Sequence, residues 1–145
     1  MAFTIDNHFE WNGVSISVQG RSDEGLGIMK LLLVEPSILL RERMVAMLSS
    51  LHGVEIVEIA AVENASRAMR GVQPEVVVMD AQKPDESGLE ALARARFECP
   101  SACMIVVSSY SPEVYRKRWL QAGADHFYDL SAQIDLLLNT VTRYS

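Results

Sequence analysis

Residues 74–90 restrict the fold of this chain more than any other stretch, and they read PEVVVMDAQKPDESGLE. Within them, Val76–Met79 form an apolar, β-branched run that is too short for a helix, which predicts a strand buried on both faces. Asp80 ends the run, turn-forming residues follow it, and a helical pattern starts at Leu89. Asp80 is therefore expected at the carboxyl end of a central strand, where open α/β sheets bind ligands. A helix-capping or loop carboxylate is the alternative interpretation.

Strand and helix patterns alternate five times from Lys30 onward. The expected strands are 31–34, 54–60, 76–80, 103–107 and 126–128. The expected helices are 37–51, 64–70, 89–97, 111–122 and 132–143, with Gly71 and Gly123 ending the second and fourth. Five βα units predict an α/β fold with a doubly wound, five-stranded parallel sheet.

Residues 1–28 differ from the rest of the chain. Asn12-Gly13 lies between two alternating segments within 3–18, which is a strong hairpin signal, and 20–27 are polar and glycine-rich like a linker. We therefore expect an N-terminal extension at 1–28 and a separate domain at 29–145. Met29 precedes the first buried strand, so an incorrectly assigned start codon is the alternative explanation of the extension.

Composition and charge exclude several functional classes. The chain has 145 residues, 49% of them hydrophobic, which suits one domain with one substantial core. A net charge of −6 argues against binding to nucleic acid or to an anionic membrane. No membrane span or signal segment is evident, so a soluble cytoplasmic protein is expected. Cys99 and Cys103 have no nearby histidine to complete a zinc site, and Cys103 is expected to fill a strand core.

From Met29 to Ser145, the chain resembles the response-regulator receiver domain at a set of separate positions. The matched positions are Asp80 as phosphoacceptor, Pro84 and Gly88 after it, Ser108 after the fourth strand, Gly123-Ala124-Asp125 before the fifth, and Phe127 within it. The resemblance implies a flavodoxin-like sheet with strand order 2-1-3-4-5.

The resemblance also implies phosphoryl transfer from a phosphohistidine donor to Asp80. In-line transfer needs a carboxylate nucleophile, a divalent cation and donors that hold the phosphoryl oxygens. In the family, an acidic pair holds Mg²⁺ together with the phosphoacceptor and a loop carbonyl, which maps here to Glu35, Asp80 and the backbone of Gln82. Ser108 would bind a phosphoryl oxygen, and Ser108 and Phe127 would form the conformational switch.

Two positions depart from the family pattern. Pro36 replaces the second acidic residue, and proline has no side-chain ligand for a metal, so the Mg²⁺ site is expected to be weak or absent. Leu130 stands where the family has a lysine, followed by Ser131. Lys83 is the one lysine beside Asp80 and is the candidate surrogate cation, although an exposed loop lysine is the simpler interpretation.

Two functional hypotheses follow from these departures, and neither is an enzyme. The favoured one is a stand-alone, atypical or pseudo-receiver with weak or no phosphorylation at Asp80, which acts through protein–protein interaction. The other is a conventional phosphoacceptor that receives its phosphoryl group from a sensor histidine kinase or a phosphotransfer protein. Aromatic residues and arginines around the fourth helix, fifth strand and fifth helix suggest a surface there for a partner or a second copy. These residues are Tyr110, Tyr115, Arg116, Arg118, Trp119, Phe127 and Tyr128. The alternative is that the helix face with Tyr115 and Trp119, four residues apart, packs on the sheet.

Overall fold

The computed structural model describes residues 2–11, 14–23, 28–59, 64–80, 85–109 and 113–144. Its strands are β1 (Ala2–Trp11), β2 (Val14–Asp23), β3 (Met29–Val34), β4 (Val54–Ile59), β5 (Val76–Asp80), β6 (Cys103–Ser108) and β7 (His126–Asp129). Its helices are α1 (Ile38–Leu48), α2 (Ala65–Val72), α3 (Glu86–Glu98), α4 (Glu113–Gln121) and α5 (Ile134–Thr142). The strands form one sheet in the order β1-β2-β4-β3-β5-β6-β7.

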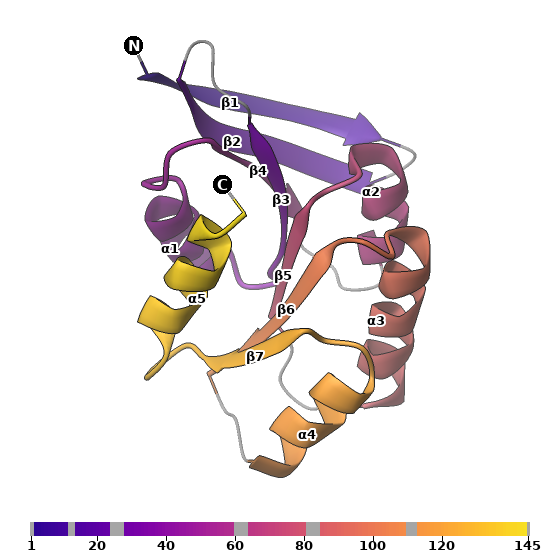
Figure 1. The fold of residues 1–145 in the computed structure, drawn as a ribbon. Helices are drawn as coiled ribbons and strands as arrows, with labels where there is room; N and C mark the ends of the chain where they lie inside the picture. The colour runs from indigo at the N-terminus through magenta and orange to yellow at the C-terminus, as the bar shows by residue number, and fades with distance from the viewer. Residues whose placement is uncertain are drawn as a thin grey trace.

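Five of these strands, β3 to β7, form the parallel sheet that the sequence predicts. Their order is β4-β3-β5-β6-β7, and every adjacent pair is parallel, so the order 2-1-3-4-5 is confirmed. Helices α1 and α5 cover one face, while α2, α3 and α4 cover the other (Figure 1). Strands buried between two helical layers need apolar residues on both sides, which explains the continuous runs at Leu31–Val34 and Val76–Met79.

Two hydrophobic clusters flank the sheet because successive strand residues lie on opposite faces. On one face, α1 and α5 pack Met44, Leu48 and Val141 against strand residues such as Leu31 and Ile105. The opposite cluster is built from α2, α3, α4 and the alternate strand positions, and includes Met69, Leu92, Trp119, Met79 and Val106. Cys103 is buried in the first cluster, as expected for a strand-core residue.

Helix ends follow the sequence signals at some positions and depart from them at others. The Ser37 side chain accepts a hydrogen bond from the N–H of Leu40 and caps α1, as its position indicates. Helix α3 begins at Glu86, three residues before the expected start at Leu89, because the Asp85 side chain caps it by accepting the N–H of Gly88 at 2.8 Å.

The two predicted glycine stops have different outcomes. Gly123 follows α4 with φ of 121°, a left-handed conformation that favours glycine. Gly71, however, lies inside α2, and the expectation that it ends the helix is wrong. Gln73 takes the left-handed position instead, with φ of 53°, and its side-chain amide donates to the carbonyl oxygen of Met69 at 3.1 Å. A polar side chain that binds the last carbonyls thus replaces the glycine cap.

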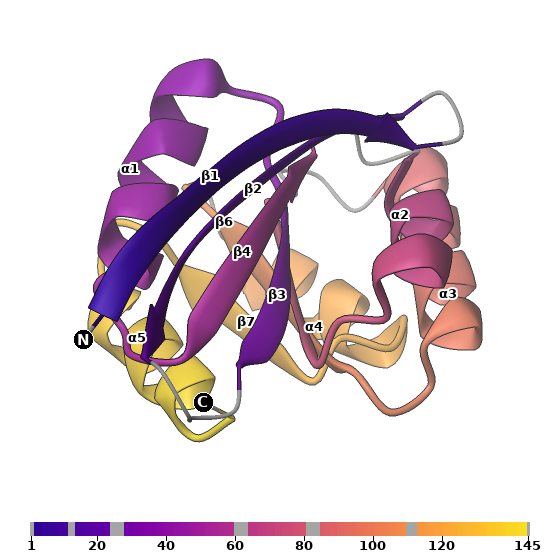
Figure 2. The ribbon, with the colours of Figure 1, turned by 90° about the horizontal axis from the view of Figure 1, so that it is seen from above.

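The N-terminal segment adds two antiparallel strands to one edge of the sheet (Figure 2). Strand β1 pairs with β2 in the hairpin that the sequence indicates, and the Asn12-Gly13 turn lies outside the described residues. Strand β2 then pairs antiparallel with β4, from Ser17 opposite Glu58 to Gly20 opposite Glu55. Residues 20–23 therefore belong to β2, and the expectation that they form part of a linker is wrong.

Candidate functional site

Three polar side chains are buried where neighbouring parallel strands end. Asp80 is the last residue of β5, Ser108 is the last residue of β6, and Glu35 directly follows β3. Their relative exposures are 6%, 0% and 1%, among strands that are otherwise apolar. The strand pairing aligns these ends, with Val34 opposite Met79 and Asp80 opposite Val107. The structure thus gathers Glu35, Asp80 and Ser108 at one edge of the sheet, as the sequence predicts.

Glu35 and Asp80 interact through their side chains in a poorly solvated site. Burial, followed by the hydrogen bond and the negative charge of Asp80, raises the pKa of Glu35 to about 8, against opposing contributions from the Ser37 N–H and Arg41. Among the described residues, no donor reaches Glu35 Oε2 or Asp80 Oδ1. Glu35 therefore retains its proton to a higher pH than an ordinary glutamate does.

The raised pKa of Glu35 predicts that stability falls as pH rises. The unfolded chain releases this proton near the ordinary pKa of 4.5, whereas the folded protein keeps it up to about 8. Between these values the folded state binds more protons, so the free energy of unfolding should decrease by on the order of 3 kcal/mol from pH 5 to pH 8 without divalent cations. Urea unfolding in EDTA measures the decrease.

Glu35→Gln should remove most of this pH dependence, because glutamine does not titrate. Glu42→Gln is the matched control, since Glu42 is exposed on the adjacent α1 and should leave the slope unchanged. Equal slopes in the wild type and Glu35→Gln would show that the Glu35 carboxyl is not the titrating group.

Arg41 and Glu58 complete the polar surroundings of the site, and the sequence analysis did not identify them. Arg41 Nη1 donates to the backbone carbonyl oxygen of Glu35 at 2.8 Å, and its Nε lies 3.5 Å from Glu58 Oε1. Both side chains are largely buried, at 20% and 9% exposure. The guanidinium therefore anchors the loop after β3 and holds a positive charge near Glu35.

The position of the family lysine is occupied by a packed hydrophobic residue. Leu130 is partly buried against the cluster beneath α1 and α5, and its N–H donates to the carbonyl oxygen of Ser108 at 3.0 Å. The next residue, Ser131, directs its N–H and hydroxyl to Asp129 Oδ1 at 2.8 and 2.5 Å. The strand end is thus closed by local contacts and places no cation at this position.

The carboxylate pair meets part of the requirement for a divalent cation. Glu35 Oε2 and Asp80 Oδ1 are buried acceptors without donors among the described residues, and Mg²⁺ is often held by one or two carboxylates together with water and phosphate. Pro36 adds no ligand, and the described residues contain no cluster of three or more acidic, histidine or cysteine side chains suited to a metal. The donor set therefore fits a weakly held Mg²⁺, provided that Glu35 loses its proton.

Other residues highlighted by the sequence lie partly outside the described structure. Gln82, Lys83 and Pro84 are among them, so the loop carbonyl and the surrogate cation remain predictions. Gly88 is described and lies against α4, where an added Cβ would approach Trp119 Cη2 to 2.9 Å. Its position thus serves close packing between α3 and α4.

Asp125 has a structural role in this arrangement. Arg96 donates to Asp125 Oδ2 at 2.6 Å and to the Gly123 carbonyl oxygen at 2.8 Å. Burial acts to raise the pKa of Asp125, but the Met104 N–H and the Arg96 guanidinium outweigh it and lower this pKa. The contacts fasten the C-terminal half of α3 to the segment before β7.

The aromatic surface expected around α4 and β7 is largely absent from the exterior. Trp119 and Phe127 are buried in the cluster formed with α2 and α3, and Tyr115 packs against it. The Tyr128 hydroxyl is hydrogen-bonded to Thr140 Oγ1 at 2.5 Å. Tyr110 lies outside the described residues. Trp119 and Phe127 are therefore core residues here, because the underlying sheet face needs large apolar side chains from α4 and β7.

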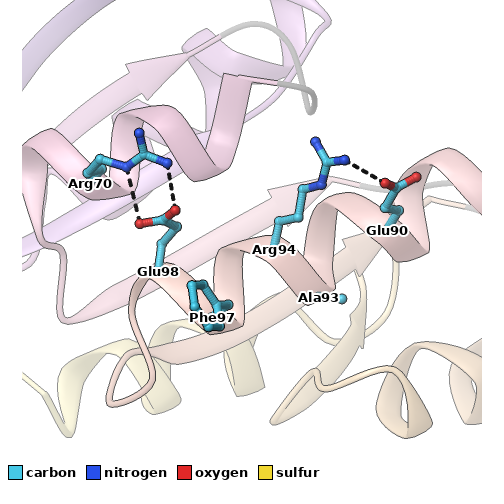
Figure 3. Close-up of a pocket in the computed structure, with 6 residues that line it drawn as sticks. All are labelled: Arg70, Glu90, Ala93, Arg94, Phe97 and Glu98. Carbon is cyan, nitrogen blue, oxygen red and sulfur yellow. Dashed lines mark hydrogen bonds and ion pairs between the residues drawn. The ribbon is translucent and has the colours of Figure 1, made fainter.

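A pocket of about 560 Å³ lies on α2 and α3 (Figure 3), and its lining includes none of Glu35, Asp80 and Ser108. It is lined by Arg70, Glu90, Ala93, Arg94, Phe97 and Glu98. The arginines are paired in ion pairs with the glutamates, each at 2.7 Å. Arg70 and Arg94 are mainly exposed, so these ion pairs contribute little to stability, and the lining includes no nucleophile.

Comparison with known proteins agrees with this geometry. The response regulator receiver domain model matches residues 31–142. Response regulator GacA from Pseudomonas aeruginosa is 27% identical over 115 residues, which are 79% of this chain and 54% of GacA. Protein-glutamate methylesterase/protein-glutamine glutaminase 2 from Anaeromyxobacter dehalogenans is 33% identical over 110 residues, which are 74% of this chain and 32% of that protein. The chain thus matches about half or less of these relatives' lengths.

Solved structures show the same fold. A two-component response regulator of the LuxR family from Aurantimonas sp. SI85-9A1 aligns with a TM-score of 0.72 and 23% identity, over 81% of this chain and 84% of the other. Within the described part of the chain, no helix is both long and apolar enough to cross a membrane.

Proposed function

This chain belongs to the response regulator receiver domain family, and we propose that it is an atypical receiver in which Asp80 is a poor phosphoacceptor. It acts as a signalling module through protein–protein interaction, and not as an enzyme. The donor of any phosphoryl group is a sensor histidine kinase or a phosphotransfer protein.

The observation that carries this proposal is the charge state around Asp80. The pKa of Glu35 is raised to about 8, mainly by burial, so a cation that binds there must displace a proton. Pro36 supplies no second carboxylate, and Leu130 packs where the family places a cation. Transfer chemistry depends mainly on positioned charges that stabilise the phosphoryl oxygens. Two of the usual contributions are therefore missing.

The remaining residues are arranged for a slow in-line transfer. An Asp80 carboxylate oxygen attacks the phosphorus as the N–P bond of the phosphohistidine breaks, and the imidazole nitrogen leaves with the bonding electron pair. Mg²⁺, when held by Glu35 and Asp80, would neutralise charge on the phosphoryl oxygens. Deprotonation of Glu35 must precede this binding. Ser108, at the end of β6, would hydrogen-bond the transferred group.

A conventional receiver is the second candidate, and the position of Ser108 favours it. Asp80, Glu35 and Ser108 are all present at adjacent strand ends, and they are buried there although burial of polar groups is costly. If the loop at 81–84 supplies the missing carbonyl and a cation, Asp80 would be phosphorylated at a normal rate.

Labelling with a small phosphodonor and Mg²⁺ distinguishes the two candidates. We expect incomplete phosphorylation, seen as a single added phosphoryl mass in intact mass spectrometry and abolished by Asp80→Asn. Asp85→Asn is the matched control, because Asp85 is an exposed carboxylate five residues after Asp80. This substitution should leave labelling unchanged. Labelling that survives Asp80→Asn would contradict the assignment of the phosphoacceptor.

The protein partner is proposed to bind at α4, β7 and α5. With Trp119 and Phe127 buried, the exposed residues of α4 are Val114, Gln121, the basic run Arg116–Arg118 and Glu113, whose carboxylate lies 3.5 Å from Arg116 Nη1. A basic surface favours an acidic partner through electrostatic complementarity. Arg116→Glu with Arg118→Glu should then weaken capture of the partner, and unchanged capture would place the interface elsewhere.

A further inference from the structure

Strand β1 forms one edge of the sheet and has one neighbouring strand, β2, among the described residues (Figure 2). It is ten residues long, and its register with β2 runs without interruption from Ala2 opposite Asp23 to Trp11 opposite Val14. Strands in globular proteins usually have about 5–6 residues. Because an edge strand leaves a row of backbone N–H and C=O groups unpaired, β1 offers a long and regular row for another strand.

Several of the usual protections of an edge strand are missing from β1, although it carries two acidic residues. Its sequence, AFTIDNHFEW, contains neither proline nor lysine, and the constant register with β2 leaves no room for a bulge. The opposite edge of the sheet is β7, which has four residues. The two edges thus differ, and β1 is the one suited to pairing.

We propose that β1 pairs antiparallel with β1 of a second copy of this chain, about a two-fold axis at Asn7. This inference is independent of phosphorylation at Asp80. The antiparallel arrangement makes both copies use the same strand, so the interface is closed and does not propagate into a filament. The result is a homodimer with one continuous sheet.

The sequence of β1 is self-complementary in this register. With Asn7 opposite Asn7, the other opposed positions are Phe3 with Trp11, Thr4 with Glu10, Ile5 with Phe9, and Asp6 with His8. Apolar residues then oppose apolar residues, and each Asp6 opposes a His8 of the other copy. Such cross-strand pairs stabilise antiparallel sheets, and the symmetry makes each of them twice.

Neighbouring registers lack this complementarity. A register centred on Asp6 places the two Asp6 carboxylates opposite each other, and one centred on His8 places Asp6 opposite Glu10. Like charges directly opposite each other are unfavourable. The charge pattern therefore favours the register at Asn7 over its two neighbours, and a second β1 supplies apolar residues opposite the apolar positions and His8 opposite Asp6.

Sedimentation velocity of the full chain over a range of concentrations tests the dimer. Asp6→Lys should weaken dimerisation on the order of tenfold, because it removes two favourable pairs. Adding His8→Asp to Asp6→Lys should restore dimerisation, because a positive charge at position 6 then opposes a negative charge at position 8 of the other copy. Glu42→Lys makes the same charge change on exposed α1 and should have no effect. A monomeric wild type, or a dimer insensitive to Asp6→Lys, would overturn the proposal.

Disulfide trapping tests the register separately. The native Cys99 and Cys103 are buried, so an introduced surface cysteine is the reactive one. Asn7→Cys should give a covalent dimer on mild oxidation, because the two-fold axis brings these positions within bridging distance. Thr4→Cys should not, because Thr4 opposes Glu10. Cross-linking of Thr4→Cys without cross-linking of Asn7→Cys would contradict this pairing.

Discussion

Pro36→Asp combined with Leu130→Lys should raise the rate of Asp80 phosphorylation about 100-fold, the size of effect expected for restored transition-state contacts. The first change adds a carboxylate beside Glu35 and Asp80, which improves the ligand set for Mg²⁺. The second places an ammonium group at the end of β7, beside Ser108, whose carbonyl oxygen accepts the N–H of residue 130 at 3.0 Å. Initial rates with a small phosphodonor and Mg²⁺ measure the gain.

Size-matched neutral variants separate charge from packing in this experiment. Pro36→Asn with Leu130→Met keeps similar volumes without adding charge, so it should remain close to the wild-type rate. Leu130 is partly buried, and a modest loss of stability in the lysine variant is expected from the lost apolar contact. If the charged pair is no faster than the neutral pair, missing charges do not limit phosphorylation.

Trp119→Ala should destabilise the domain by about 3–5 kcal/mol, which is typical for removal of a buried tryptophan. Trp119 is the largest fully buried side chain among the residues whose burial the structure describes, and it packs α4 against α3 and the sheet. The ring of Trp119 lies close to the α3 backbone at Gly88, which has no side chain. An alanine at position 119 would therefore leave a cavity that the neighbouring residues cannot easily fill. Equilibrium unfolding in urea gives the difference in the free energy of unfolding.

Phe97→Ala is the matched control for this prediction. Phe97 is an aromatic residue on α3 that is 82% exposed, so its removal should change stability by less than about 0.5 kcal/mol. A comparable loss for both variants would mean that Trp119 is no more buried than Phe97 and would contradict the packing of α4.

The parallel sheet and the central site were predictable because both depend on local patterns. Apolar runs as short as Val76–Met79 have few alternatives to a buried strand, and polar residues that directly follow such runs must gather at one sheet edge. Asp80 was found in this way, whereas Glu35 and Ser108 were assigned through the resemblance to the receiver domain. The absence of a lysine at Leu130 could also be read directly from the sequence.

The features that were missed depend on contacts between distant residues. Arg41 lies in a charged stretch of α1 that is typical of an exposed helix face, and its approach to Glu58 requires the packing of α1 over β4. Glu58 did carry a signal, since an acidic residue inside an apolar strand needs a partner. Likewise, the burial of Trp119 depends on the small residue at Gly88, which belongs to another helix.

The N-terminal hairpin shows a similar limit. The turn signal at Asn12-Gly13 indicates two paired strands, but pairing between β2 and β4 involves residues about 40 positions apart. Polar and glycine-rich composition at 20–23 suggested a linker, and the strand there depends on its neighbours in the sheet rather than on its own propensity.

The time course of wild-type phosphorylation tests the central claim most directly. Intact mass spectrometry should follow the chain at pH 7 with excess phosphodonor and Mg²⁺, beside the Pro36→Asp, Leu130→Lys variant. Since Pro36 adds no carboxylate and Leu130 supplies no charge, we predict slow labelling that remains well below one phosphoryl group per chain. Rapid labelling of the wild type to one phosphoryl group per chain, at Asp80, would contradict the account and establish a conventional receiver.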